Sequence, residues 1–258
     1  MIIAITGSTC AIGRQLIERL EAERFSVIPL GGRNSGIWKL GEAFPAQIQA
    51  DVLVHLAHDR ELSLDENKYA IDILVRSFKG YQILLSSLSS HSETKSIYGL
   101  SKKYAEQQIL STNGGCVRAG IVFGSHSEGF FKMIQGTISQ VPVVPLPYSG
   151  KSRFFFTHID DLCSEILDLI QNQKKGIIFG ANYWPLTLKE MSKRIAIANG
   201  KKTFFIGISP IVTRIFVRVA TIFRLKASLI DSLRSLNREI TNSEISRLIV
   251  PKTKFRSF

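Results

Sequence analysis

The sequence contains few cysteines and no cysteine motif. Cys10, Cys116 and Cys163 are the only three in 258 residues, they are widely separated, and no CxxC pair occurs. An odd number of scattered cysteines argues against a disulfide framework and against a zinc site. The first residues, MIIAITGS, lack the charged segment and the cleavage site of a signal peptide. We therefore expect a protein of a reducing compartment, the cytoplasm.

Long hydrophobic runs and hydrolase motifs are also missing. No uncharged stretch reaches the ~20 residues that a membrane-spanning helix needs, and arginines interrupt the apolar residues 208–225. The absence of a GxSxG elbow and of a Walker-type loop leaves hydrolases and nucleoside triphosphatases without support. The five histidines do not cluster. His55 lies in an apolar run, where a core role is more common than metal binding, so we expect no metal.

Positive charge is concentrated toward the C-terminus. The whole chain has a net charge of +12, and residues 201–258 contain 12 basic and 3 acidic residues. Such a segment suits nucleic acid, an anionic membrane or a phosphorylated substrate, and charge alone does not choose among them. It lacks the interleaved aromatic and basic residues that are typical of nucleic-acid binding, so we disfavour that partner.

The first half alternates strand-like and helix-like segments, which predicts a parallel sheet with helices on its faces. The predicted strands are residues 2–6, 26–30, 37–40, 51–57, 81–86 and 115–123, and the predicted helices are residues 12–23, 66–78 and 98–110. We predict an α/β fold: a Rossmann-like doubly wound parallel sheet over residues 1–124 and a small C-terminal substrate lobe over residues 125–258. Residues 153–180 are expected to return to the first domain.

The second half has a looser pattern. Residues 141–150, rich in proline and glycine, predict a loop, whereas residues 158–170 and 186–198 predict helices. Thr187 and Glu190 have the spacing of a capping box at the start of the second helix.

Residues 210–236 would form an amphipathic helix. Arginines lie on one side, and the other side has an apolar stripe of Ile211, Ile215, Val219 and Ile222. Most such stripes pack on a core, and the alternative is an interfacial helix lying on an anionic membrane. Both interpretations remain open.

The segment TGSTCAIG, residues 6–13, joins the first strand to the first helix. Glycines at such a junction allow a tight turn, and the helix N-terminus offers free N–H groups to a pyrophosphate. Gly7 and Gly13 have the spacing of the first and third glycines of a dinucleotide-binding turn, and Cys10 stands at the middle position. A purely structural turn is the alternative.

Arg33 follows the second predicted strand, where NAD-binding proteins usually place a carboxylate. A guanidinium suits a 2′-phosphate, so we prefer NADP over NAD as the cofactor. An exposed loop arginine is the alternative interpretation.

Tyr98 and Lys102 are four residues apart and share a face of a predicted helix. A phenol has an ordinary pKa near 10, and a neighbouring ammonium group lowers it toward the range of a useful acid and base. The helix follows the strand that ends in SSLSS, so the hydroxyl of Ser87 is a candidate for polarising a substrate carbonyl.

With these motifs in this order, the chain resembles the extended short-chain dehydrogenase/reductases, in particular the NAD-dependent epimerase/dehydratase group acting on nucleotide sugars. The resemblance covers TGSTCAIG, DVLVHLAH, Asn67, SSLSSHSETKSIYGLSKKYAEQQI, VRAGIVFG, RFFFTHIDDL and FGANYWPLTLKEM. It implies that Tyr98 is the catalytic acid and base and that Lys102 is its partner. Ser87 would hold the reacting oxygen, with Ser89 as the second choice.

The resemblance also implies binding residues. Those expected at the cofactor are Gly7, Thr9, Cys10, Ile12, Gly13, Arg33, Leu56, Ala57 and Lys102, and those expected at the substrate are Ser89, Arg118 and Arg153. Two departures from the family pattern matter. Cys10 replaces a glycine, and the Asp-Glu pair that follows the catalytic hydroxyl in the 4,6-dehydratases is absent. Dehydration is therefore disfavoured.

The expected function is that of an NAD(P)-dependent reductase or epimerase acting on a nucleotide-activated sugar or keto-sugar, as in polysaccharide biosynthesis. The alternative is a cofactor-binding sensor or assembly protein of the same fold without turnover, which Cys10 and the short lobe motivate. Beyond a small-molecule substrate, a homodimer and a peripheral membrane contact are the partners left open.

Overall fold

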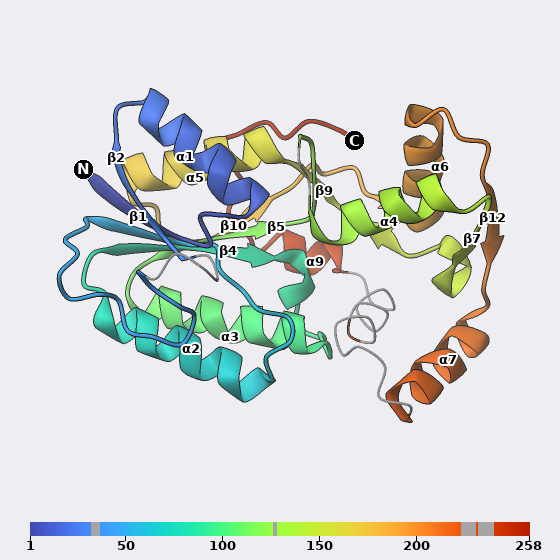
Figure 1. Cartoon of the computed structure of the whole chain (residues 1–258), viewed down its shortest axis with the longest axis horizontal. Helices are drawn as coiled ribbons and strands as arrows, with labels where there is room; N and C mark the ends of the chain where they lie inside the picture. The colour runs from blue at the N-terminus through green and yellow to red at the C-terminus, as the bar shows by residue number, and fades with distance from the viewer. Residues whose placement is uncertain (32–36, 126–127, 223–230, 232–239) are drawn as a thin grey trace.

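Apolar runs of the first half and one run of the second half form the strands of a central sheet. The computed structural model describes residues 1–31, 37–125, 128–222, 231 and 240–258 (Figure 1). The strands of this sheet are β1 (Ile2–Thr6), β2 (Ser26–Leu30), β3 (Val52–His55), β4 (Tyr81–Ser87), β5 (Gly115–Ala119) and β10 (Gly176–Gly180). They are all parallel, in the order β10-β5-β4-β3-β1-β2. The predicted Rossmann-like sheet is confirmed.

Helices cover both faces of the sheet, which explains why its strands are apolar throughout. Helices α1 (Ala11–Ala22) and α5 (Ile159–Asn172) lie on one face, and α2 (Leu64–Ser77) and α3 (Ile97–Ser111) lie on the other (Figure 1). The chain moves outward from β1 to β2 and then crosses to β3 on the other side of β1. The strand order therefore changes direction at β1. Ligands bind such sheets at the carboxyl ends of the strands next to this point.

The prediction of a strand at residues 37–40 is wrong, and β2 is an edge of the central sheet. Trp38 is 2% exposed and packs in a cluster with Leu30 and Leu53. Its indole N–H donates to the carbonyl of Glu42 at 3.0 Å. The segment between β2 and β3 is too short for another strand with its crossovers, so a large side chain fills the space instead.

Residues 115–123 form two strands rather than the single predicted one. After β5 the chain leaves the central sheet at Gly120, and β6 (Ile121–Phe123) pairs with β9 (Phe156–His158). A Cβ at Gly120 would lie 2.2 Å from the carbonyl oxygen of Phe155, so only glycine fits this close approach. The bend directs β6 toward the smaller lobe.

The predicted loop at residues 141–150 contains a strand. β7 (Val143–Leu146) pairs in parallel with β12 (Phe204–Gly207), and the 3₁₀ turn η2 (Pro147–Gly150) follows. Proline is tolerated on an edge strand, such as β7 in this two-stranded sheet. The strand was missed because its partner lies about 60 residues away and leaves no local signal.

The smaller lobe also contains α4 (Gly129–Gln140), β8 (Arg153–Phe154), β11 (Leu186–Thr187), α6 (Leu188–Ala198) and α7 (Pro210–Ile222). The short helix α9 (Asn242–Ile245) packs beside the end of β10. The capping box predicted for α6 is confirmed: Thr187 Oγ1 accepts from the N–H of Glu190 at 3.1 Å, and the Glu190 carboxylate accepts from the N–H of Thr187 at 2.8 Å. β10 lies beside β5 in the central sheet. The domain boundary at residue 124 stays a prediction.

The apolar stripe of α7 does not pack on a core in the part of the helix whose side chains are described. Ile211, Ile215 and Val219 are 69%, 55% and 43% exposed, whereas Thr213 and Val217 are buried. The expectation of a core-packed stripe is therefore wrong for these three residues. The side chain of Ile222 and residues 223–230 and 232–236 lie outside the described part. Among the described helices, none combines the length and the apolarity needed to cross a membrane.

Candidate active site

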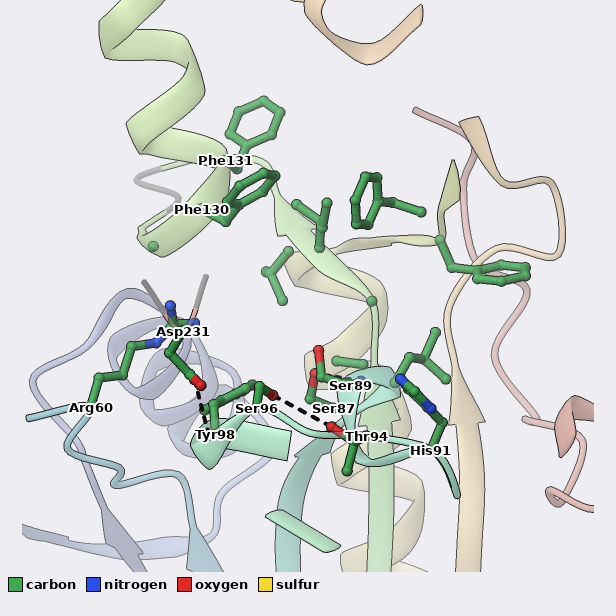
Figure 2. A pocket seen from close by; sticks show the side chains of 18 of the residues that line it. Arg60, Ser87, Ser89, His91, Thr94, Ser96, Tyr98, Phe130, Phe131 and Asp231 are labelled. Atoms are coloured by element: carbon green, nitrogen blue, oxygen red, sulfur yellow. Dashed lines mark hydrogen bonds between the residues drawn. The ribbon is translucent and has the colours of Figure 1, made fainter. Parts of the chain in front are cut away.

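A cavity of about 1160 Å³ lies where the carboxyl ends of β4 and β5 meet the smaller lobe. This volume is slightly above the range of about 300–1,000 Å³ that is usual for small-molecule sites. Residues from both parts of the molecule line it, among them Cys10, Ala11, Ile12, Ser87, Ser89, Tyr98, Phe130, Phe131, Arg153, Arg214 and Arg218. Figure 2 shows Tyr98, Ser87 and Ser89 on the side of the central sheet and the two phenylalanines across from them.

The glycine turn is packed tightly between β1, β3 and α1. Gly7 has a φ of +70°, and a Cβ there would lie 2.8 Å from the N atom of Ala57. A Cβ at Gly13 would lie 2.5 Å from the Gly7 carbonyl oxygen. The hydroxyl of Ser8 donates to the Gly31 carbonyl at 2.9 Å and ties the turn to the end of β2. Both glycines are therefore required by this geometry, which leads straight into the N-terminus of α1.

Cys10, at the middle position of the turn, is the N-cap of α1. Its Sγ accepts a hydrogen bond from the N–H of Gly13 at 3.3 Å, so one of the free donors of the helix N-terminus is occupied. Burial raises the pKa of the Cys10 thiol, which keeps it neutral. Cys10, Ala11 and Ile12 still line the cavity, so the start of α1 faces it.

The other predicted cofactor residues have different surroundings. Ala57, beside Gly7, is half-buried, Leu56 is 7% exposed, and Thr9 is exposed at the surface of the turn. Leu56 belongs to the core between the sheet and α1. Arg33, on which the preference for NADP depends, lies outside the described residues.

Tyr98 and Lys102 have the predicted placement on one face of α3. Tyr98 is half-buried in the first turn of the helix and lines the cavity, and Lys102 is 5% exposed. The Lys102 Nζ donates to the Leu85 carbonyl at 2.8 Å. Burial lowers the pKa of Lys102 to about 8, although the carboxylate of Glu106 opposes the shift.

Two side chains from the loop after β3 surround the ring of Tyr98. His58 meets it edge-on, with 4.9 Å between ring centroids, and the guanidinium carbon of Arg60 lies 4.7 Å from the ring centroid. The position of Arg60 is that of a cation–π contact. Burial, together with the charges of Lys102 and Arg60, lowers the pKa of His58 to about 2. The imidazole beside the phenol is therefore neutral.

Ser87 and Ser89 lie close together at the end of β4 and in the following 3₁₀ turn η1 (Leu88–Ser90), and both line the cavity (Figure 2). Ser87 Oγ accepts from the N–H of Ser89 at 3.1 Å. Because this bond uses a lone pair of Ser87, its O–H remains able to donate to a group in the cavity. The structure thus brings the three predicted groups of Tyr98, Ser87 and Ser89 to one cavity.

Comparisons with known proteins add to this geometry. No protein-family model matches the chain, and no curated protein matches its sequence. Solved structures match its fold. A dTDP-4-dehydrorhamnose reductase from Clostridium acetobutylicum superposes with a TM-score of 0.69 at 17% identity, covering 81% of this chain and 84% of that chain. The UDP-glucose 4-epimerase of Thermus thermophilus, complexed with NAD, has a TM-score of 0.67 at 16% identity, covering 81% and 87%.

A third structure is dTDP-4-dehydrorhamnose reductase from Bacillus anthracis in complex with NADP. It superposes with a TM-score of 0.68 at 17% identity, covering 81% of this chain and 84% of that chain. The chain has the extended short-chain dehydrogenase/reductase fold. The resemblance predicted from the sequence is confirmed at the level of the fold.

Within this extended short-chain dehydrogenase/reductase fold, Arg118 does not reach the cavity. Its guanidinium binds the Glu106 carboxylate through bonds of 2.8 and 2.7 Å, and the two side chains are 11% and 2% exposed. Glu106 also accepts from the hydroxyls of Ser86 and Ser90. This buried group holds α3, β4, η1 and β5 together. Arg118, expected to bind substrate phosphates, instead neutralises a carboxylate under the site.

Arg153 does line the cavity, as expected, from β8. Four further cations there were missed as site residues: Arg60, Lys95, and Arg214 and Arg218 of α7. The spacing of Arg214 and Arg218 placed them on one side of a helix, but nothing in the sequence indicated which surface that side would meet. Arg60 follows the DVLVHLAH segment and had no recognisable signal.

Asp231 is a further residue that the sequence did not indicate. Its carboxylate accepts hydrogen bonds from the N–H of Ile97 at 2.7 Å and of Tyr98 at 3.1 Å, and it lines the cavity (Figure 2). A carboxylate at this position interacts favourably with the positive end of the α3 dipole. Because the bonded residues are more than 130 positions apart, no local pattern could have revealed the contact.

Proposed function

We propose that this chain is an NAD(P)-dependent reductase or epimerase of a nucleotide-activated sugar or keto-sugar. The observation that supports the proposal most is that Tyr98, Ser87 and the N-terminus of α1 line one cavity, with Lys102 on the same face of α3 as Tyr98. The superposed reductase and epimerase structures, named for nucleotide-sugar substrates and solved with NADP or NAD, have the same fold.

The turn and the start of α1 fit a dinucleotide, because the N-terminus of α1 faces the cavity through Cys10, Ala11 and Ile12. The residues that would hold it are Gly7, Thr9, Cys10, Ile12 and Gly13 near the pyrophosphate, Leu56 and Ala57 beside the turn, and Lys102 at a ribose. Its nicotinamide would supply or accept a hydride. The preference for NADP depends on Arg33 and stays a prediction.

In this proposal Tyr98 exchanges a proton with the sugar oxygen. Lys102, with a pKa of about 8, is mainly protonated at pH 7, and it places a positive charge one helical turn after Tyr98. The O–H of Ser87 donates to the same sugar oxygen, with Ser89 as the second choice. When a carbonyl is reduced, Tyr98 protonates the new alkoxide and Ser87 stabilises the developing charge.

Arg153 is the proposed ligand of the substrate phosphates, together with Arg214 and Arg218, which line the same cavity. Arg118 is left out because Glu106 occupies its guanidinium. A homodimer, a cytoplasmic location and a role in polysaccharide biosynthesis stay predictions.

A cofactor-binding protein without turnover is a second candidate, because the thiol of Cys10 occupies the N–H of Gly13 at the predicted pyrophosphate site. This function predicts binding of NAD(P)H with no change in any sugar. The presence of Tyr98 and Ser87 at the cavity favours the enzyme instead.

Replacing Tyr98 with phenylalanine tests the proposed function. Proton transfer by a positioned side chain contributes roughly 10²–10⁴-fold to a rate, so Tyr98→Phe should lose at least about 100-fold in kcat while NADPH binding, followed by fluorescence, is unchanged. The assay screens nucleotide sugars and their keto forms with NADH and NADPH. A fully active variant would show that the assigned mechanism is wrong. A wild type that binds NADPH and converts no sugar would favour the second candidate.

A further inference from the structure

The two-stranded sheet of the smaller lobe has an apolar face that points to solvent. In the register of β7 and β12, Phe204 is paired with Val143 and Ile206 with Pro145. All four of these residues are exposed. Successive side chains of a strand point to opposite faces, and the alternate residues, Val144, Leu146 and Phe205, pack inside the lobe. The outward face is therefore apolar although nothing in the described part of the chain covers it.

The same apolar character continues on α7, which follows β12 after a short connection. Ile211, Ile215 and Phe216 are 69%, 55% and 51% exposed, and β12 and α7 lie along one edge of the molecule (Figure 1). We call the exposed side chains of these elements the lobe surface: Val143, Pro145, Phe204, Ile206, Ile211, Val212, Ile215, Phe216 and Val219. Exposed apolar groups gathered in this way mark an interaction site.

The charge around the lobe surface has one sign. Residues 191–230 contain no acidic residue. In the described part of this stretch, Arg214 and Arg218 line the cavity, and four further basic residues are exposed outside it: Lys193, Arg194, Lys201 and Lys202. Exposed apolar side chains together with basic ones are typical of surfaces that lie in the interface of an anionic bilayer. The charge thus matches lipid headgroups.

The adjoining face of α7 forms part of the wall of the cavity. Arg214, Val217, Arg218 and Thr221 line it and form one stripe of the helix, whereas Ile211 and Ile215 face solvent. A ligand phosphate at Arg214 or Arg218 and a membrane under the apolar face would contact neighbouring faces of one helix, within its thickness of about 10 Å. The cavity therefore lies next to the surface that suits a bilayer.

We propose that the lobe surface docks on an anionic membrane and that the cavity takes a sugar carried on a lipid phosphate, with Arg214 and Arg218 at the phosphate groups. The hydride and proton transfer in this inference rests on the function proposed above, with a lipid phosphate in place of the nucleotide as the carrier of the sugar. The docking does not, because it depends only on the lobe surface and its charge. A lipid-linked substrate explains why α7, which has exposed apolar side chains as well as arginines, forms the wall between the cavity and the molecular surface.

Co-sedimentation with vesicles tests the docking. The full chain is mixed with phosphatidylcholine vesicles with and without phosphatidylglycerol. The test variant is Ile215→Asp with Phe216→Asp, because both side chains are exposed and neither lines the cavity. The control is Tyr69→Asp on α2, where an apolar side chain of similar exposure, 61%, lies away from the lobe surface.

We expect the wild type and the control to bind the anionic vesicles, with weaker binding in high salt. The test variant should bind at least about tenfold more weakly. A wild type that stays in the supernatant, or a test variant that binds equally well, overturns the docking. So does a dimer that forms without lipid and is dissociated by the same substitutions, because a second protein copy would then cover the surface. Circular dichroism spectra and urea midpoints like those of the wild type show that the variants are folded.

A second assay tests the substrate class. A polyprenyl diphosphate sugar in vesicles is compared with the corresponding nucleotide sugar in solution, and the product sugar is measured. We expect a higher kcat/KM for the lipid-linked sugar and a loss of that advantage in the test variant. The nucleotide sugar could instead have an equal or higher kcat/KM that neither vesicles nor the substitutions of the test variant change. The lipid-linked substrate is then wrong, and the function proposed above stands. If neither sugar is converted, both fail, and the vesicle assay alone decides the docking.

Discussion

Residues one helical turn apart on α3 have very different surroundings. Tyr98 is half-buried and faces the cavity, whereas Lys102 is 5% exposed and donates to a backbone carbonyl. The sequence predicted that the two share a face, since that depends only on helical spacing. The burial of Lys102 beneath the end of β4 depends on the packing of α3 against the sheet, and this burial lowers its pKa.

The depressed pKa of Lys102 makes stability depend on pH. The pKa is about 8 in the folded protein against an ordinary 10.5, so between pH 8 and 10.5 the unfolded state binds more protons and stability rises with pH. Relative to Lys102→Met, the free energy of unfolding of the wild type should increase by up to ~3 kcal/mol across this range. Urea unfolding of both proteins at pH 7 to 10 measures it. Parallel pH profiles would contradict the prediction.

At the scale of elements, one buried carboxylate connects the parts that hold the site. Glu106 of α3 binds Arg118 of β5 and accepts from the hydroxyls of Ser86 and Ser90 near the end of β4. These contacts set the position of Ser87 relative to Tyr98. Both partners of the ion pair are deeply buried, so removing either leaves a charge without compensation.

Glu106→Ala should therefore be strongly destabilising. Removing one partner of a buried ion pair costs about 3–5 kcal/mol, and the loss should appear as a lower urea midpoint. Glu18→Ala, at an exposed position of α1, is the control and should change the free energy of unfolding by less than about 0.5 kcal/mol. A Glu106→Ala protein as stable as the control would show that the pair contributes little to the fold.

At the scale of the whole molecule, C-terminal residues complete the site begun by the N-terminal half. α7 provides Arg214 and Arg218, and Asp231 caps the start of α3. Glu244 of α9 also accepts from the N–H of Ser92, in the loop before α3, at 2.6 Å. The segment that bears Tyr98 is thus held by two carboxylates from the far end of the chain.

The contact of Asp231 can be tested directly. Asp231→Ala removes the acceptor for two N–H groups of α3 and should lower the free energy of unfolding by about 1 kcal/mol. Asp231→Asn keeps one acceptor oxygen and should lose less. Thermal unfolding of the three proteins measures the difference. Equal melting temperatures would mean that this contact does not stabilise the helix.

Some of the fold follows from neighbouring residues alone. The apolar runs of the central strands, the spacing of Gly7 and Gly13, the capping box of α6 and the shared face of Tyr98 and Lys102 were all predictable. Each depends on backbone and side-chain preferences within a few positions. The local pattern therefore determined five of the six strands of the central sheet, the turn and the candidate acid and base, but not β10.

Tertiary structure alone decided which charged groups meet the cavity and which apolar groups stay outside the core. Arg118 is paired with Glu106, Arg214 and Arg218 line the cavity, and the stripe of α7 faces solvent. The pairing of β7 with β12 was hidden in the same way. In each case the decisive partner lies far along the chain, and its contact exists only after the chain has folded around the central sheet.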